Sequence, residues 1–133
     1  MRSFLPVALL MLLGGCAPDM KLDGPWQLGE TDTSNDRMLC REIDGACVGD
    51  QLPGPQVYGA GWDRNYVVFV KHPIEADGFT PDPTRSEYFY VVRGAGEAEA
   101  SFAIVLRGPF DEEQFKRETA RLKLPPITVW PDY

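Results

Sequence analysis

The segment Tyr66-Val67-Val68-Phe69-Val70 constrains the fold more than any other, because all five of its residues are apolar. β-Branched and aromatic side chains favour extended backbone, so the segment predicts a strand. Successive side chains of a strand point to opposite faces. Val67 and Phe69 therefore lie on one face, and the other three residues lie on the opposite face. A strand that is apolar on both faces belongs in the centre of a sheet.

Several other segments are rich in strand-forming residues. Residues 57–62 form a hairpin with residues 66–73, because the intervening Asp63-Arg64-Asn65 tolerates turn geometry. The remaining strands are predicted at residues 26–28, 37–43, 87–93 and 102–107, with a short final strand or an extended tail at 127–130. This pattern predicts an antiparallel sheet of about five to seven strands.

The hydrophobic period changes after the last of these long strands. Asp111 and Gln114 have the spacing of a capping box, which predicts a helix that starts at Glu112. Pro125-Pro126 ends this helix. A mainly antiparallel sheet with one C-terminal α-helix is an α+β fold. Residues 26–133 are enough for one small β-rich domain.

The first residues have the three-part pattern of an export signal. A short positive start at Met1-Arg2-Ser3 precedes an apolar run at residues 4–13. A membrane-spanning helix needs roughly 20 apolar residues, and this run has about ten, so a permanent span is the less favoured interpretation. Residues 1–15 are therefore predicted to be a signal peptide.

The signal ends in Leu13-Gly14-Gly15-Cys16, which resembles the bacterial lipobox. The resemblance implies that Cys16 becomes an acylated N-terminus that anchors the protein in a membrane. Lipoproteins that stay on the inner membrane tend to carry Asp after the cysteine. Ala17 stands there instead, which implies the periplasmic face of the outer membrane. The alternative is an ordinary export signal with an incidental cysteine.

The segment after the lipidation site is polar and is interrupted by Pro and Gly. Residues 16–25 are therefore predicted to be the lipidated cysteine and a short tether, which joins the anchor to the domain.

Acylation of Cys16 leaves Cys40 and Cys47, which are expected to form a disulfide in an oxidising compartment. A two-residue turn at Asp44-Gly45 would place Cys47 opposite Glu42, so the bridge is expected to need a longer loop or a β-bulge. Two cysteines without a nearby histidine or a second pair do not complete a zinc site, and their spacing is not the C-x-x-C of redox proteins. No metal and no other cofactor is predicted.

The chain is acidic. Its formal net charge is −7, and removal of Arg2 with the signal peptide makes it −8. This charge argues against nucleic acid as a partner, because phosphates attract Lys and Arg. It also argues against electrostatic docking on anionic lipids, so membrane attachment is expected to depend on the acyl chains. A basic partner is compatible with the charge, although solubility alone explains most acidic surfaces.

Residues 74–86 form a loop long enough to suggest a functional role. The possible partner-binding residues are Trp62, His72, Asp77, Phe79 and Asp82. The first functional hypothesis is therefore a non-enzymatic, lipid-anchored binding or accessory protein of the envelope, with a possible protein partner there.

The second hypothesis is an acidic inhibitor of a basic envelope-attacking enzyme such as lysozyme, suggested by the small size, the acidic charge and the expected disulfide. Lysozyme-inhibiting lipoproteins resemble the chain in size and lipidation. Their Ser-Gly-containing binding motif is not found in it.

The third hypothesis is a hydrolase that uses His72, the only histidine of the chain. Such an enzyme needs His72 beside Ser86 or Ser101, and neither serine has the flanking residues of a nucleophile elbow. His72 follows a predicted strand and is expected to satisfy backbone groups. No catalytic residue is assigned.

Four blocks of the sequence carry a broader resemblance. They are Tyr58-x-x-Gly61-Trp62-Asp63-x-x-Tyr66, His72-Pro73, Tyr88-x-Tyr90 and Gly108-Pro109-Phe110-Asp111. Their order is similar to that in a family of small uncharacterised bacterial lipoproteins. The resemblance spans residues 57–115 and implies no particular activity, and residues 17–56 are not matched.

Overall fold

The structure is a computed structural model, and it describes residues 20–30 and 36–130. The signal peptide predicted at residues 1–15 and the predicted lipidation site, Cys16, lie outside the described residues. Within the described ranges, no helix is long and apolar enough to cross a membrane.

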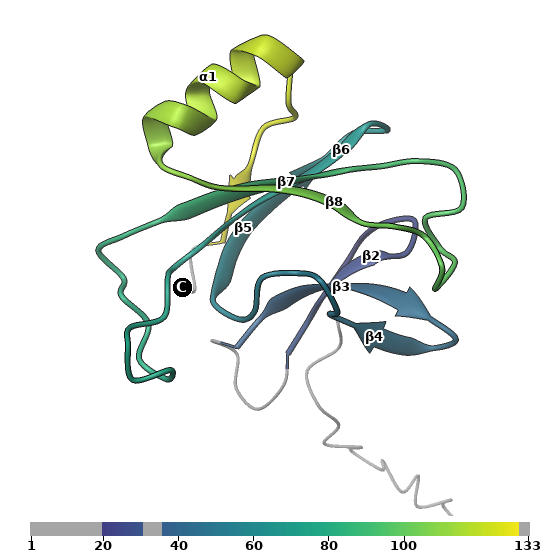
Figure 1. Cartoon of the computed structure of the whole chain (residues 1–133), viewed down its shortest axis with the longest axis horizontal. Coiled ribbons are helices and arrows are strands. Elements are labelled where there is room, and N and C mark those ends of the chain that lie inside the picture. The colour runs from purple at the N-terminus through teal and green to yellow at the C-terminus, as the bar shows by residue number, and fades with distance from the viewer. Residues whose placement is uncertain (1–19, 31–35, 131–133) are drawn as a thin grey trace, which may run out of the picture.

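The described chain consists of nine strands and one helix, α1 (Glu112–Leu122) (Figure 1). The strands are β1 (Met20–Asp23), β2 (Trp26–Gly29), β3 (Met38–Ile43), β4 (Ala46–Val48), β5 (Val57–Trp62), β6 (Tyr66–Lys71), β7 (Glu87–Val92), β8 (Val105–Phe110) and β9 (Thr128–Val129). They form two antiparallel sheets with the orders β1-β2-β3-β4 and β8-β7-β6-β5-β9. The predicted fold class, mainly antiparallel α+β with one C-terminal helix, is confirmed.

The strands divide into two sheets, where the sequence pattern suggested one sheet of about five to seven strands. Two of the strands are too short to show a clear alternation: β4 has three residues and β9 has two. Tertiary packing decides which strands they pair with, and the hydrophobic pattern of the sequence does not show these partners.

Strand β6 is the central strand of the larger sheet, as its double-sided apolar pattern predicted. Val67 and Phe69 are buried against the smaller sheet, in a cluster that includes Trp26 and Leu39. On the opposite face, Val68 belongs to a second buried cluster that includes Phe115 of the helix. The protein therefore has three layers, which are the smaller sheet, the larger sheet and α1 (Figure 1).

Helix α1 begins at the predicted capping box. The Gln114 N–H donates to Asp111 Oδ1 at 2.8 Å, and the Asp111 N–H donates to Gln114 Oε1 at 2.9 Å. Phe115 is the buried residue of the helix, and its ring stacks on Tyr88 of β7 with 4.9 Å between the centroids. The cap thus sets the start of the helix, and Phe115 attaches it to the larger sheet.

The described part of the segment predicted to be a tether, residues 16–25, is folded. Met20–Asp23 is strand β1, and the chain turns at Gly24-Pro25 into β2. Met20 and Leu22 pack against the buried cluster between the two sheets, the one that includes Trp26. The alternation of apolar and polar residues in Met-Lys-Leu-Asp is a strand signal, although Pro18, Gly24 and Pro25 flank it.

Strand β8 is Val105–Phe110 and not residues 102–107. It contains Pro109, which has no N–H to donate. This is tolerated because β8 is an edge strand that pairs with β7 alone.

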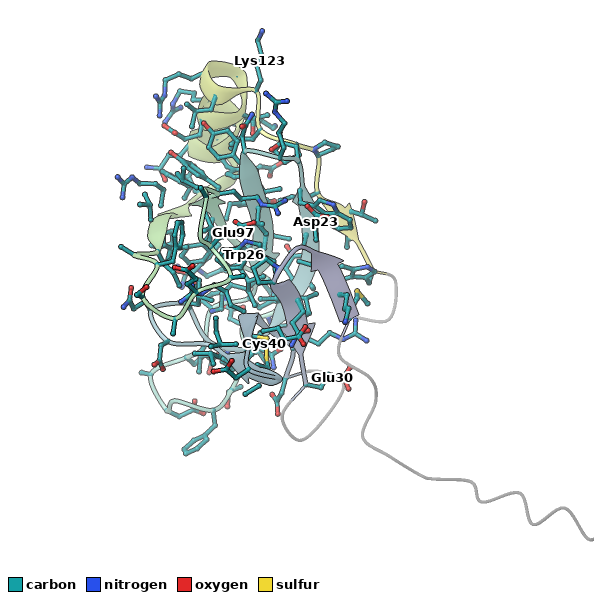
Figure 2. The ribbon with its side chains drawn as sticks, turned by 90° about the vertical axis from the view of Figure 1, so that its right-hand side faces the viewer. Asp23, Trp26, Glu30, Cys40, Glu97 and Lys123 are labelled. Atoms are coloured by element: carbon teal, nitrogen blue, oxygen red, sulfur yellow. A yellow bond between two sulfur atoms is a disulfide. The ribbon has the colours of Figure 1, made fainter. Side chains whose placement is uncertain are left out.

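Cys40 and Cys47 lie at disulfide-bonding distance, with their Cα atoms 5.4 Å apart (Figure 2). Asp44-Gly45 is a two-residue turn, and Cys47 is paired with Glu42. The expectation that the bridge needs a longer loop or a bulge is wrong. Cys40 and Cys47 are diagonal neighbours on one face of the hairpin, and strand twist brings one such diagonal pair closer.

Candidate functional site

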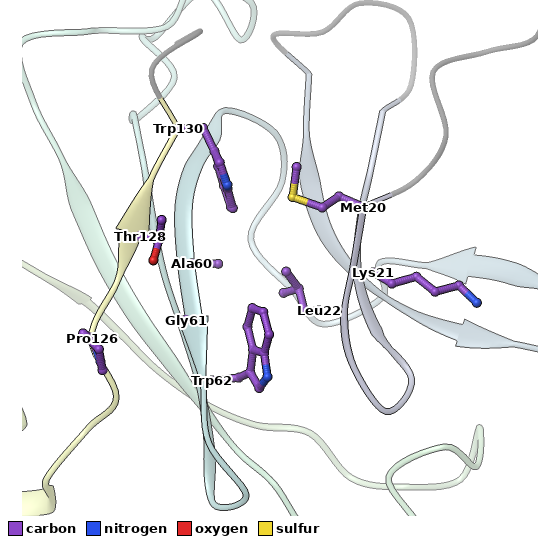
Figure 3. A pocket seen from close by; sticks show the side chains of 9 residues that line it. All are labelled: Met20, Lys21, Leu22, Ala60, Gly61, Trp62, Pro126, Thr128 and Trp130. Atoms are coloured by element: carbon purple, nitrogen blue, oxygen red, sulfur yellow. The ribbon is translucent and has the colours of Figure 1, made fainter.

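An apolar groove of about 350 Å³ lies between the smaller sheet and the edge of the larger one (Figure 3). Strand β1 forms one wall, and β5 with the chain around β9 forms the other. The lining residues are Met20, Lys21, Leu22, Ala60, Gly61, Trp62, Pro126, Thr128 and Trp130.

The wall at β9 depends on a proline and a glycine. The pairing of β9 with β5 covers only Gly59 and Ala60, because Pro126 has no N–H with which to continue the ladder. The carbonyl group of Pro126 packs against Gly61 so closely that a Cβ on Gly61 would overlap it. Gly61 is therefore required for the approach of the two segments.

The side chains that face the groove are mostly apolar. Trp62, which is 44% exposed, and Trp130 stand at opposite ends, and Met20 and Leu22 face them from β1 (Figure 3). The side chain of Lys21 points away from the groove. A surface of indole and aliphatic groups suits an apolar ligand.

Trp130 is held in place by two contacts. The main-chain N–H of Trp130 donates to the carbonyl oxygen of Tyr58 at 3.1 Å and fixes the backbone there. The guanidinium carbon of Arg37 lies 6.0 Å from the centre of the indole, and Arg37 Nε is 2.8 Å from Glu30 Oε1. The ring therefore has a defined position at the end of the groove.

Arg93 connects the two walls. Its Nη1 donates to Asp23 Oδ2 at 2.5 Å and to the main-chain oxygen of Asp63 at 2.8 Å. Asp23 directly follows Leu22, and Asp63 directly follows Trp62. Arg93 Nη1 therefore binds a residue adjacent to each wall, and these two hydrogen bonds hold β1 and β5 at a fixed separation.

Glu97 completes this network (Figure 2). Its Oε1 accepts from Arg93 Nη2 at 2.8 Å, and its Oε2 accepts from Trp26 Nε1 at 2.9 Å. Burial by itself raises the pKa of Glu97, but the hydrogen bonds from Arg93 and Trp26 outweigh it and hold the pKa below its usual value. The hydrogen bond to Glu97 in turn raises the pKa of Arg93. The network is therefore ionic at neutral pH.

The loop at residues 74–86 has a defined shape. Glu75 N–H donates to the carbonyl oxygen of Thr80 at 2.8 Å, and Asp77 Oδ1 accepts from the N–H groups of Phe79 and Thr80, each at 2.8 Å. Asp82 Oδ1 likewise accepts from the backbone N–H two residues later, at 3.0 Å. Phe79 stands at the tip with 87% of its surface exposed.

The two loop aspartates are engaged inside the loop. Hydrogen bonds from the side chain and backbone of Thr80 lower the pKa of Asp77, and those from Thr84 lower the pKa of Asp82. Across the part of the chain that the structure describes, no three His, Cys, Asp or Glu residues are grouped so as to hold a metal ion.

His72 joins the loop to the larger sheet. Its Nδ1 lies 2.8 Å from the carbonyl oxygen of Arg85. A carbonyl only accepts, so the hydrogen bond assigns the proton to Nδ1. The imidazole stacks on Tyr58 with 4.2 Å between the centroids, and the Tyr58 hydroxyl is 2.5 Å from that of Ser86. These contacts are those of a residue that satisfies a backbone group.

The five residues predicted to bind a partner lie in two places. His72, Asp77, Phe79 and Asp82 belong to the loop and its base. Trp62 lies next to the turn of the β5–β6 hairpin, at the other end of β6, and lines the groove.

The groove itself was not predicted, because its members Met20 and Trp130 come from opposite ends of the described chain. The available signals were the Met-Lys-Leu-Asp alternation and a tryptophan in a short C-terminal strand.

The chain was compared with protein-family models, with curated proteins and with solved structures, and none of these comparisons found a match. The assignment of function therefore depends on the groove, the loop and the sequence.

Proposed function

We propose that this protein is a lipid-anchored, non-enzymatic protein of the bacterial envelope that binds a protein partner through the loop at residues 74–86. The observation that carries the binding role is the exposure of Phe79, 87%, at the tip of a loop whose shape is set by hydrogen bonds. Because hydrogen bonds to Asp77 already fix the backbone at Phe79, the exposed ring contributes apolar contact area without the entropic cost of ordering the loop on binding.

The N-terminal sequence supports the anchor. A positive start and an apolar run lead to Leu13-Gly14-Gly15-Cys16, and Ala17 follows the cysteine. An acylated Cys16 places the domain at the periplasmic face of the outer membrane. The acidic charge makes the acyl chains, and not electrostatic attraction to anionic lipid, the source of membrane attachment.

The loop can be tested by placing a photoreactive phenylalanine analogue at position 79 of the full chain in living cells. This change leaves the fold intact, because Phe79 is almost fully exposed. Illumination is expected to crosslink the chain to one protein partner. The matched control carries the same analogue at Val105, another exposed apolar residue, on β8. Identical products from both positions, or none from position 79, would contradict the proposed partner surface.

A second candidate function is inhibition of a basic enzyme that attacks the envelope, such as lysozyme. The acidic residues Glu75, Asp77 and Asp82 surround Phe79 in sequence, on a loop of defined shape. A pre-shaped acidic loop complements the cleft of a basic enzyme. Purified protein should then inhibit lysozyme at low salt, and Phe79→Ser should weaken the inhibition. Full lysozyme activity at low salt in the presence of the wild-type chain rejects this candidate.

A further inference from the structure

We propose that the groove between β1, β5 and β9 takes up one acyl chain of a bilayer phospholipid, and that this contact holds the domain against the membrane surface. The proposal rests on the proposed lipidation of Cys16. It concerns a different part of the molecule from the loop that is proposed to bind a protein partner.

The first argument is the reach of the chain. Met20 lines the groove and follows Cys16 by four residues. An extended chain spans at most about 3.3–3.6 Å per residue, so Met20 cannot lie more than about 14 Å from an anchored Cys16. The polar layer of a bilayer is only several ångströms thick on each side. The groove is therefore within reach of the lipid surface at all times.

The second argument is the chemistry of the walls. Met20, Leu22 and Ala60 present aliphatic groups, and Trp62 and Trp130 present indoles. Tryptophan is enriched where a protein meets the membrane interface, because its ring is apolar and its N–H is polar. The net charge of the chain is negative, so apolar contact is the interaction that favours lipid here.

The third argument is shape. The groove has a volume of about 350 Å³, within the range of roughly 300–1,000 Å³ that small-molecule sites occupy. Trp62 and Trp130 mark its two ends, and Met20 and Leu22 face them across it (Figure 3). An apolar groove with an indole at each end suits a hydrocarbon chain. The hydrogen bonds from Arg93 to Asp23 and Asp63 hold the walls in position before a ligand arrives.

The test uses the full chain, purified in detergent from membranes of cells that express it and reconstituted into vesicles of phosphatidylethanolamine and phosphatidylglycerol. In one set of vesicles, part of the phospholipid carries bromine on its acyl chains, because bromine quenches tryptophan fluorescence on contact. Before the fluorescence is measured, flotation of the vesicles shows whether the chain is attached to them. Trp26 is fully buried and serves as the internal reference.

We expect brominated vesicles to lower the emission by up to about two thirds, because two of the three tryptophans line the groove. The double variant Trp62→Phe/Trp130→Phe, which keeps Trp26 alone, should show almost no loss. A chain that floats with the vesicles but is not quenched overturns the groove proposal and leaves the anchor intact. This is also the result expected if the acyl chain of Cys16 itself, a peptide or a second copy fills the groove. A chain that does not float overturns the anchor, and the groove proposal falls with it.

Discussion

The indole N–H of Trp26 donates a hydrogen bond of 2.9 Å to Glu97, which lies 71 positions later in the chain. Trp26 is a fully buried residue of β2 in the smaller sheet, whereas Glu97 lies in the connection between β7 and β8 of the larger sheet. The bond therefore joins the two sheets. Arg93 binds the same carboxylate and extends the connection to both walls of the groove.

Glu97 should make the protein less stable in acid. Its pKa in the folded protein lies below the usual value of 4.5 that it has in the unfolded chain, so the unfolded chain takes up the proton first as the pH falls. The stabilisation is complete above the unfolded pKa and is lost as the pH falls through the folded pKa. Glu97→Gln should lower the free energy of unfolding by about 1–2 kcal/mol at neutral pH. The free energy of unfolding of this variant should also decrease less than that of the wild type as the pH falls. Urea unfolding measured across the acid range checks this.

The control for Glu97 is Glu75→Gln, which neutralises an exposed carboxylate of the loop. Its unfolding free energy should follow that of the wild type at each pH. If the free energy of unfolding of Glu97→Gln depends on pH in the same way as that of the wild type, ionised Glu97 does not stabilise the folded protein.

Gly61→Ala should destabilise the protein, because the added methyl group overlaps the carbonyl of Pro126. Overpacking of this kind costs about 1–3 kcal/mol. Thermal or urea unfolding of the variant measures the change. The matched control is Gly54→Ala, where the added Cβ has no atom within 4 Å; its stability should stay within about 0.5 kcal/mol of the wild type. Equal stability of the two variants would show that β9 moves away from β5 at no cost.

Reduction of the Cys40–Cys47 pair should lower stability, because a closed loop of about eight residues restricts the unfolded chain and contributes about 2.5 kcal/mol. Cys47 is exposed, so a reductant has access to it. Thermal unfolding with and without reductant measures the effect. The variant Cys40→Ala/Cys47→Ala should melt at the same temperature in both conditions. A wild type that also ignores the reductant indicates two free thiols.

Cys16→Ser should release the protein from membranes, because the change removes the proposed site of acylation. Membrane and soluble fractions of cells, separated after a high-salt wash, show the distribution. Cys47→Ser is the control and should remain with the membranes. If Cys16→Ser also stays there, the lipobox interpretation is wrong.

Prediction from the sequence succeeded where the cause is local. The helix start at Glu112 depends on hydrogen bonds between Asp111 and Gln114, three residues apart. The central position of β6 follows from an apolar pattern inside a single strand. The sequence also predicts the pairing of Cys40 with Cys47, which lie at disulfide-bonding distance. The expected longer loop or bulge is absent from this hairpin, because strand twist, and not the count of residues in the turn, sets the distance between the cysteines.

By itself, the sequence determined a mainly antiparallel α+β fold with a double-sided central strand and a capped C-terminal helix, because side-chain periodicity and capping act over a few neighbouring residues. Only the tertiary structure decided that the strands form two sheets, that Trp62 is separated from the loop around Phe79, and that Met20 and Trp130 line one groove. These features depend on packing and on the contacts of Arg93 and Glu97, which connect segments far apart in the chain.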